Sequence, residues 1–151
     1  MAVERLIFLK MKIKVKKIHP EAKVPIFAQA GDAGLDMFSV DDLTINPGER
    51  SEIHTGVAIL LPLGYVGLLW DKGGPSIGYG MKVLGGVFDS NYTGEYVLCL
   101  ANLSDKPYVI KKGQKVAQLL IQKVEMPEIV ETEELPETNR GDGRKGSTGL
   151  F

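Results

Sequence analysis

Short strand-like segments, separated by turns that contain glycine or proline, recur along this chain and restrict the fold that it can adopt. One clear turn is 46–49, where Pro47 presets φ and Gly48 supplies the positive φ of the next position. Strand signals lie on both sides of that turn between residues 43 and 60, and others occur at 11–18, 66–70, 96–102, 108–110 and 115–124. Many short strands at close intervals predict an all-β sandwich, jelly roll or barrel and argue against a doubly wound α/β fold.

The composition is that of one ordinary soluble domain. The chain has 151 residues, of which 44% are hydrophobic, enough for one buried core. Its formal charge of -1 gives no basic field that would attract nucleic acid or an anionic membrane, so we expect neither partner. The apolar run near the start is too short for a membrane span and lacks a small-residue cleavage site, which predicts a cytoplasmic protein. The single cysteine, Cys99, lies between two leucines and is expected to be buried, in a reducing compartment.

Three segments are expected along the chain. Residues 1–10 form an N-terminal extension, because the alternating strand at 11–18 could itself begin a protein, and the apolar residues of the extension need cover from the domain or a partner. Residues 11–126 form the β domain. Residues 127–151 form a flexible C-terminal arm whose last part is too rich in glycine to hold structure unaided, so it is either disordered or ordered by a ligand.

The stretch 81–95 is the first candidate for a functional site. Gly85 and Gly86 hinge two short predicted strands and would let a ligand approach bare backbone. Asp89 leaves this apolar hairpin, where partial desolvation would tune a general base, although a turn aspartate on a surface hairpin is an equal alternative. Tyr92 lies among small and polar residues, so its ring can wall a pocket.

Other polar residues suit phosphate or metal chemistry. Asp32 and Asp36 could hold a hydrated cation, although Asp32 could equally cap a turn. Lys72 and the glycines after it could present a cation and backbone N–H groups to phosphate, without the Gly-Lys-Ser/Thr ending of a P-loop. Gln118 lies in an apolar strand and must bond to backbone or to ligand. The two histidines of the chain lie in no motif, so neither a nucleophilic triad nor a zinc site is expected.

Five stretches, taken in order, resemble the motifs of the trimeric dUTP diphosphatase family. They are 30–38, 71–76, 86–95, 113–118 and 140–149. The resemblance spans essentially everything after residue 11 and depends on the order of the motifs, because each is weak alone. It implies a jelly roll of the β-clip type, assembled as a homotrimer, in which the arm of one subunit closes over a site formed by the others.

The resemblance also implies a reaction and a set of site residues. dUTP would be hydrolysed to dUMP and pyrophosphate, with Asp89 activating the water that attacks the α-phosphate. Backbone near Gly86 would read uracil, and Tyr92 would pack under the deoxyribose and exclude a ribose 2′-hydroxyl. Asp36 would hold Mg²⁺ through water, and the metal would neutralise phosphate charge. The other substrate-binding residues would be Lys72, Gly73 and Gln118, together with Arg140, Ser147 and Thr148 of the arm.

Several positions depart from the family pattern. Gly73 follows Lys72 where the family has a serine hydroxyl near the bridging phosphate oxygen, and losing such a donor costs about two to three powers of ten in rate. Lys145 occupies the place of an aromatic residue that stacks on uracil, Thr93 replaces Arg or Gln, and Asn91 replaces an acidic residue. We therefore expect an intact pocket with reduced turnover.

Two functions are consistent with these motifs. One is dUTP hydrolysis. The alternative is a homotrimer of the same fold with weak or no catalysis, an assembly or scaffold subunit of natural or engineered origin, with residues 1–10 mediating a higher assembly. A related activity of the fold, dCTP deamination, fits poorly because residues 96–100 lack the glutamate that this chemistry needs.

Overall fold

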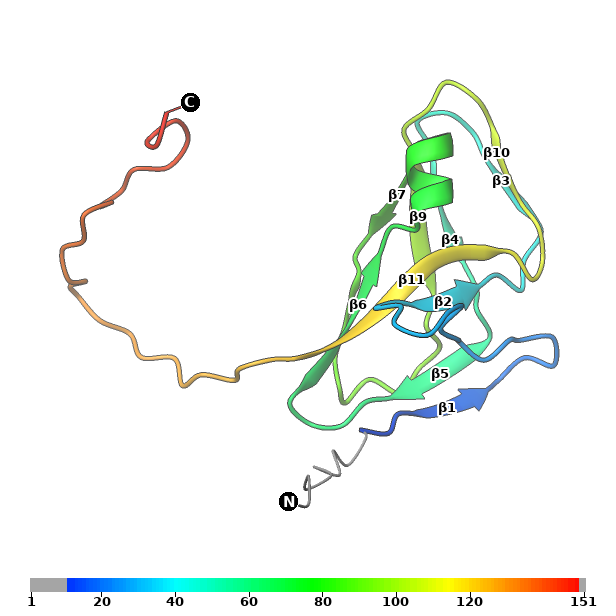
Figure 1. Cartoon of the computed structure of the whole chain (residues 1–151), viewed down its shortest axis with the longest axis horizontal. Helices are drawn as coiled ribbons and strands as arrows, with labels where there is room; N and C mark the ends of the chain where they lie inside the picture. Colours follow the sequence, from blue (N-terminus) through cyan, green and yellow to red (C-terminus); the bar gives the residue numbers. More distant parts are fainter. Residues whose placement is uncertain (1–10, 150–151) are drawn as a thin grey trace, which may run out of the picture.

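The computed structural model describes residues 11–149, which form an all-β body with an extended C-terminal segment (Figure 1). The strands are β1 (Lys14–Lys17), β2 (Leu35–Phe38), β3 (Leu43–Ile45), β4 (Arg50–Ile53), β5 (Val57–Leu60), β6 (Tyr65–Trp70), β7 (Met81–Leu84), β8 (Val87–Phe88), β9 (Leu98–Asn102), β10 (Tyr108–Ile110) and β11 (Lys115–Lys123). One helical segment, η1 (Gly74–Gly78), lies between β6 and β7. Within residues 11–149 no helix has the length and apolar character needed to cross a membrane. The all-β prediction is confirmed.

Antiparallel pairing joins the described strands into four sheets. The largest has the order β2-β11-β6-β8, and a three-stranded sheet has the order β4-β9-β7. β1 pairs with β5, and β10 pairs with β3. β11 holds the largest sheet together, because Gln118 lies opposite both Asp36 on β2 and Trp70 on β6. Two polar residues are thereby placed side by side within the sheet.

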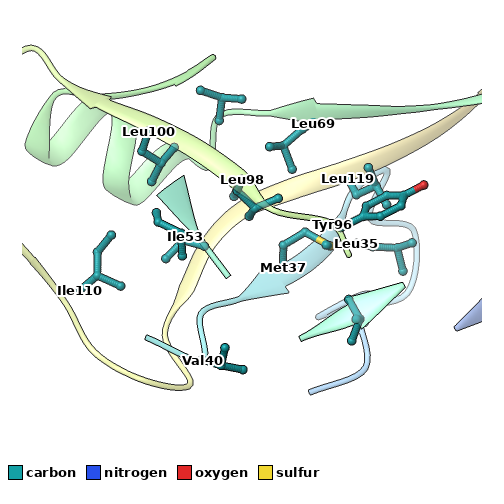
Figure 2. Close-up of a cluster of buried hydrophobic side chains, with 14 of the residues drawn as sticks. Leu35, Met37, Val40, Ile53, Leu69, Tyr96, Leu98, Leu100, Ile110 and Leu119 are labelled. Atoms are coloured by element: carbon teal, nitrogen blue, oxygen red, sulfur yellow. The ribbon is translucent and has the colours of Figure 1, made fainter. Parts of the chain in front are cut away.

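The core lies between the sheets and follows the alternation of their strands. On β9, Leu98 and Leu100 are buried, and Figure 2 shows them gathered with Ile53 and Met37 in one apolar cluster. Cys99 points to the opposite face of β9 and is only partly buried. The prediction of a buried Cys99 is therefore wrong, because apolar sequence neighbours in a strand face the other way.

The stretch 81–95 contains the two predicted strands, but they do not pair with each other. β7 pairs with β9, whereas β8 pairs with β6 in the largest sheet. Gly85, at a φ of 60°, turns the chain from one sheet to the other. Gly86 then approaches β6 so closely that an added Cβ would lie 2.5 Å from the Leu69 carbonyl oxygen. The first glycine is needed for its positive φ and the second for its missing side chain.

The two ends of the chain differ from the β body. The predicted extension 1–10 lies outside the described residues, and β1 is shorter than the strand predicted at 11–18. Beyond β11 the chain runs away from the β body, and nearly every residue from 127 to 149 is exposed (Figure 1). Ile129 and Leu135 in this segment are 93% and 83% exposed. Apolar side chains in this position favour contact with another surface.

Candidate active site

Asp89 follows β8 at the edge of the largest sheet. Because β8 runs antiparallel to β6, the chain passes along the β6 edge from Gly86 towards Asp89. The Asp89 side chain is exposed, so the predicted desolvation is absent in the single chain, and a further surface would have to supply it. An open pocket of about 480 Å³ contains Asp89 and is also lined by Tyr65, Ser90, Asn91 and Met126.

Tyr92 folds back beside Asp89. Its backbone N–H donates to the Asp89 carbonyl over 3.1 Å, and its hydroxyl donates to the Glu95 carbonyl over 2.8 Å. The ring lies against Phe88, with 6.2 Å between ring centroids, and is 42% exposed. The tyrosine ring is therefore partly supported by protein and partly exposed, so a ligand can reach it.

A buried carboxylate lies between two lysines. We call this group, Asp36 with Lys72 and Lys115, the lysine cluster. Asp36 is 2% exposed, and its two carboxylate oxygens lie 2.6 Å from Lys72 Nζ and 2.7 Å from Lys115 Nζ. Burial by itself raises the pKa of Asp36, but the hydrogen bonds from Lys115 and Lys72 outweigh it and hold the pKa below its ordinary value. Lys115 was missed by the sequence analysis, although its place at the start of the fourth motif could have suggested it.

The lysine cluster does not fit the magnesium role predicted for Asp36. Two ammonium groups already neutralise the carboxylate, and they repel a further cation. Among residues 11–149 no group of three or more His, Cys, Asp or Glu side chains is arranged to hold a metal ion. Asp32 caps a turn, the second of the two roles considered for it, because its carboxylate accepts the Gln29 backbone N–H over 2.9 Å.

Gln118 and Asp71 position the loop that carries Lys72 and Gly73. The Gln118 amide donates to the Asp71 carbonyl over 2.8 Å, so its hydrogen bond goes to backbone. The Asp71 carboxylate accepts the Val83 backbone N–H over 2.6 Å and pairs with Lys82. A Cβ added at Gly73 would meet nothing within 4 Å, which leaves the start of the loop open to a ligand. Asp71 was also missed by the sequence analysis.

The arm residues predicted to bind phosphate lie apart from the β body. Arg140 Nε donates to the Gly143 carbonyl over 2.8 Å, and Ser147 Oγ donates to the Arg144 carbonyl over 2.9 Å. Thr148 is exposed in the same turn-rich segment. These are local bonds within the arm, and Figure 1 shows that the arm extends away from the β body.

The register of β11 and β6 separates the predicted site residues. Gln118 lies opposite Trp70, and Lys123 lies opposite Tyr65, five positions further along. At a strand rise of about 3.4 Å per residue this is a distance of about 17 Å. The lysine cluster lies at the Trp70 end, whereas the Asp89 pocket contains Tyr65 at the other end. The structure therefore places most of the predicted site residues in three groups, the Asp89 pocket, the lysine cluster and the arm. Gly86 lies instead beside Leu69, nearer the Trp70 end of β6.

A family model described as dUTPase matches residues 20–149. The chain belongs to the dUTPase family. Two similar relatives are each named deoxyuridine 5'-triphosphate nucleotidohydrolase. The protein of Corynebacterium diphtheriae is 41% identical over 141 residues, which cover 91% of this chain and 93% of the relative. The protein of Hydrogenobaculum sp. is 44% identical over 143 residues, which cover 93% of this chain and 99% of the relative. The resemblance found in the sequence is confirmed.

Solved dUTPase structures share this fold. A mutant dUTPase of Staphylococcus bacteriophage 80alpha, with dUpNHpp, matches with a TM-score of 0.86 at 29% identity and covers 92% of this chain and 99% of that chain. A mutant dUTPase from phage phi11 of S. aureus, described with a structural Mg(II) ion, matches with a TM-score of 0.78 at 27% identity. The match covers 83% of this chain and 99% of that chain.

Proposed function

We propose that this chain hydrolyses dUTP to dUMP and pyrophosphate. The observation that carries this proposal is membership of the dUTPase family across 20–149, together with relatives that cover the chain and are named for the activity. The same relatives make a scaffold subunit without catalysis the less favoured alternative. A solved neighbour that contains dUpNHpp agrees with a deoxyuridine triphosphate as the substrate class.

Asp89 is the general base of the proposed reaction. Its exposed carboxylate borders an open pocket, so water can reach it. Asp89 takes a proton from that water as the water oxygen bonds to the α-phosphorus, and the bond between this phosphorus and the bridging oxygen breaks to release pyrophosphate. Lys72 supplies positive charge to the phosphates, and Asp36 and Gln118 position it by holding its side chain and its loop.

The substrate is selected by the edge of β8 and the residues after it. Backbone near Gly86 reads uracil, and the absence of a Cβ at Gly86 lets this segment lie close against the Leu69 carbonyl of β6. Tyr92 stacks under the deoxyribose, and its fixed ring occupies the space that a 2′-hydroxyl needs.

A homotrimer of β-clip jelly-roll subunits completes the proposed site. Trp70, beside the lysine cluster, and Tyr65, in the Asp89 pocket, are about 17 Å apart along β6, and this separation supports the assembly, because a second copy can bring its own cluster to the pocket. The arm supplies the third part from another copy, and residues 127–149 leave the body with exposed apolar side chains. Arg140, Ser147 and Thr148 then exchange their local bonds for the β- and γ-phosphates, to which a guanidinium and hydroxyl donors are suited.

Magnesium enters the proposed site with the substrate. Mg²⁺ keeps most of its water ligands and commonly binds through substrate phosphates, so a triphosphate can carry it. This arrangement needs no carboxylate ligand from the lysine cluster.

Pyrophosphate release from dUTP and magnesium tests the proposed function. We expect wild-type protein to release pyrophosphate and Asp89→Asn to lose at least about a hundredfold in kcat, because general-base catalysis contributes about two to four powers of ten. Asp105→Asn, at an exposed turn aspartate, is the matched control and should keep wild-type activity. No release above background at high protein concentration would defeat the enzyme and favour the scaffold alternative.

A further inference from the structure

The Tyr92 ring is restrained from three sides. Its hydroxyl donates to the Glu95 carbonyl over 2.8 Å. Its ring centroid lies 6.2 Å from that of Phe88 and 6.1 Å from that of Tyr96. On the third side is Gly94, where an added Cβ would lie 2.5 Å from the tyrosine hydroxyl. A ring that excludes a sugar hydroxyl must keep one orientation, because rotation would open the excluded space.

Glu95, whose backbone carbonyl accepts the hydrogen bond from the Tyr92 hydroxyl, is itself held by a loop distant in sequence. One carboxylate oxygen accepts the Gly56 backbone N–H over 2.8 Å, and the other lies 3.0 Å from His54 Nδ1. The Glu95 backbone also forms an isolated antiparallel bridge with Ala58 of β5. The segment 54–56 connects β4 to β5, so these bonds tie the Tyr92 loop to a separate part of the β body.

The His54–Glu95 pair depends on charge. The hydrogen bond that His54 donates to Glu95 raises the pKa of His54 above its ordinary value, against a smaller effect of desolvation, and the carboxylates of Glu95, Asp41 and Glu52 add to the rise. Asp41 also accepts the His54 backbone N–H over 2.8 Å. Burial by itself raises the pKa of Glu95, but the bonds from His54 and the Gly56 backbone outweigh it and lower that pKa. Both members of the pair are therefore charged between the lowered pKa of Glu95 and the raised pKa of His54, and the ion pair is lost as the pH rises through the raised value.

We propose that Glu95 is a positioning residue for Tyr92, and that Glu95 and His54 together set the discrimination between deoxyribose and ribose. This inference rests on the proposed function, in which Tyr92 lies under the sugar. Glu95 fixes the ring through its backbone carbonyl, and His54 fixes Glu95 through its carboxylate. Selectivity for dUTP over UTP is highest while His54 is protonated and falls as the pH rises.

The ratio of kcat/KM for dUTP to kcat/KM for UTP tests this positioning. Glu95→Gln keeps an acceptor for Gly56 but loses the ion pair, and Tyr92→Phe keeps the ring but loses the hydroxyl. We expect each to lower the ratio by roughly threefold to tenfold, the effect of one hydrogen bond, mainly through faster UTP hydrolysis. If Glu95 had a purely structural role, Glu95→Gln would lower dUTP and UTP hydrolysis together. An unchanged ratio of kcat/KM values would therefore overturn the inference.

The pH profile of the same ratio isolates His54. In wild-type protein the ratio should fall as the pH rises through the His54 titration, whereas in His54→Gln it should be low and flat. His19→Gln removes the other histidine, and Glu128→Gln removes an exposed glutamate of the arm; both should follow the wild-type profile. A wild-type profile in His54→Gln would contradict the inference.

A measurement without catalysis separates this inference from the proposed function. The NMR signals of the Tyr92 ring should follow the titration of His54 in wild-type protein and should not do so in His54→Gln. If wild-type protein released no pyrophosphate from dUTP, the proposed function would fail, and this titration would still decide whether His54 and Glu95 position the ring. Tyr92 signals that stay constant through the His54 titration would overturn the positioning.

Discussion

Gly73 is a residue whose replacement is expected to increase activity. Its φ of -53° and ψ of -44° are accessible to any residue, and an added Cβ would meet nothing within 4 Å. We predict that Gly73→Ser raises kcat for dUTP by at least about tenfold, because it supplies a donor near the phosphates, and such donors are worth up to about two to three powers of ten. Steady-state pyrophosphate release measures the gain.

Gly74 provides the matched control for that change. It also has nothing within 4 Å of an added Cβ, and it directly follows Gly73. We expect Gly74→Ser to leave kcat near the wild-type value. Equal rates for the two serine variants would show that the hydroxyl at position 73 does not reach the reaction.

Asp36 connects separate strands through its two lysines, so replacing it is expected to change the stability of the contacts between those strands. It joins β2 to the start of β11 through Lys115 and to the loop after β6 through Lys72. We predict that Asp36→Asn lowers the free energy of unfolding by about 2 kcal/mol at neutral pH, a typical value for hydrogen bonds to a charged group. Urea denaturation measures it, with Asp105→Asn as the exposed control.

The pH dependence of that difference has a defined sign. The lysines hold the pKa of Asp36 below its ordinary value, so its contribution is present above about pH 4 and is lost as the pH falls through the lowered pKa. The unfolding free energies of wild-type protein and Asp36→Asn should therefore converge in acid. A difference that stays constant down to pH 2 would rule out the ion pairs as its source.

The contact between β8 and β6 depends on the missing side chain of Gly86. A Cβ there would lie 2.5 Å from the Leu69 carbonyl oxygen, whose backbone must move to admit it. We predict that Gly86→Ala lowers the free energy of unfolding by about 1 to 3 kcal/mol, as overpacking does, and raises KM for dUTP by displacing the uracil-reading backbone. Gly78→Ala, where an added Cβ meets nothing within 4 Å, should change neither quantity.

At the scale of the whole molecule, the separation of the site residues predicts complementation between chains. Asp89→Asn and Arg140→Ala should each have low activity alone. Mixed trimers reassembled from equal amounts of the two variants should recover up to about a quarter of wild-type activity, because a site then can combine an intact Asp89 and an intact Arg140 from different copies. Pyrophosphate release after mixed refolding measures the recovery, and no recovery in verified mixed trimers would indicate that each chain closes its own site.

The sequence by itself determined the strands, the turns and the family. The apolar run of β11 and the turn at 46–49 record local preferences, which depend on residues close together in the chain. The order of five motifs was enough to identify the dUTPase family, which the family match and the named relatives confirm. Asp89 and Tyr92 could be chosen as candidates because their short stretch carries both glycines and polar groups.

Only the tertiary structure decided which groups are partners. It assigned β7 and β8 to different sheets, paired Asp36 with two lysines, and brought His54 to Glu95 across 41 positions of sequence. Partner choice of this kind depends on sheet register and burial, which arise from contacts distant in the chain. A local pattern shows that a polar residue needs a partner, but the fold determines which residue fills that need.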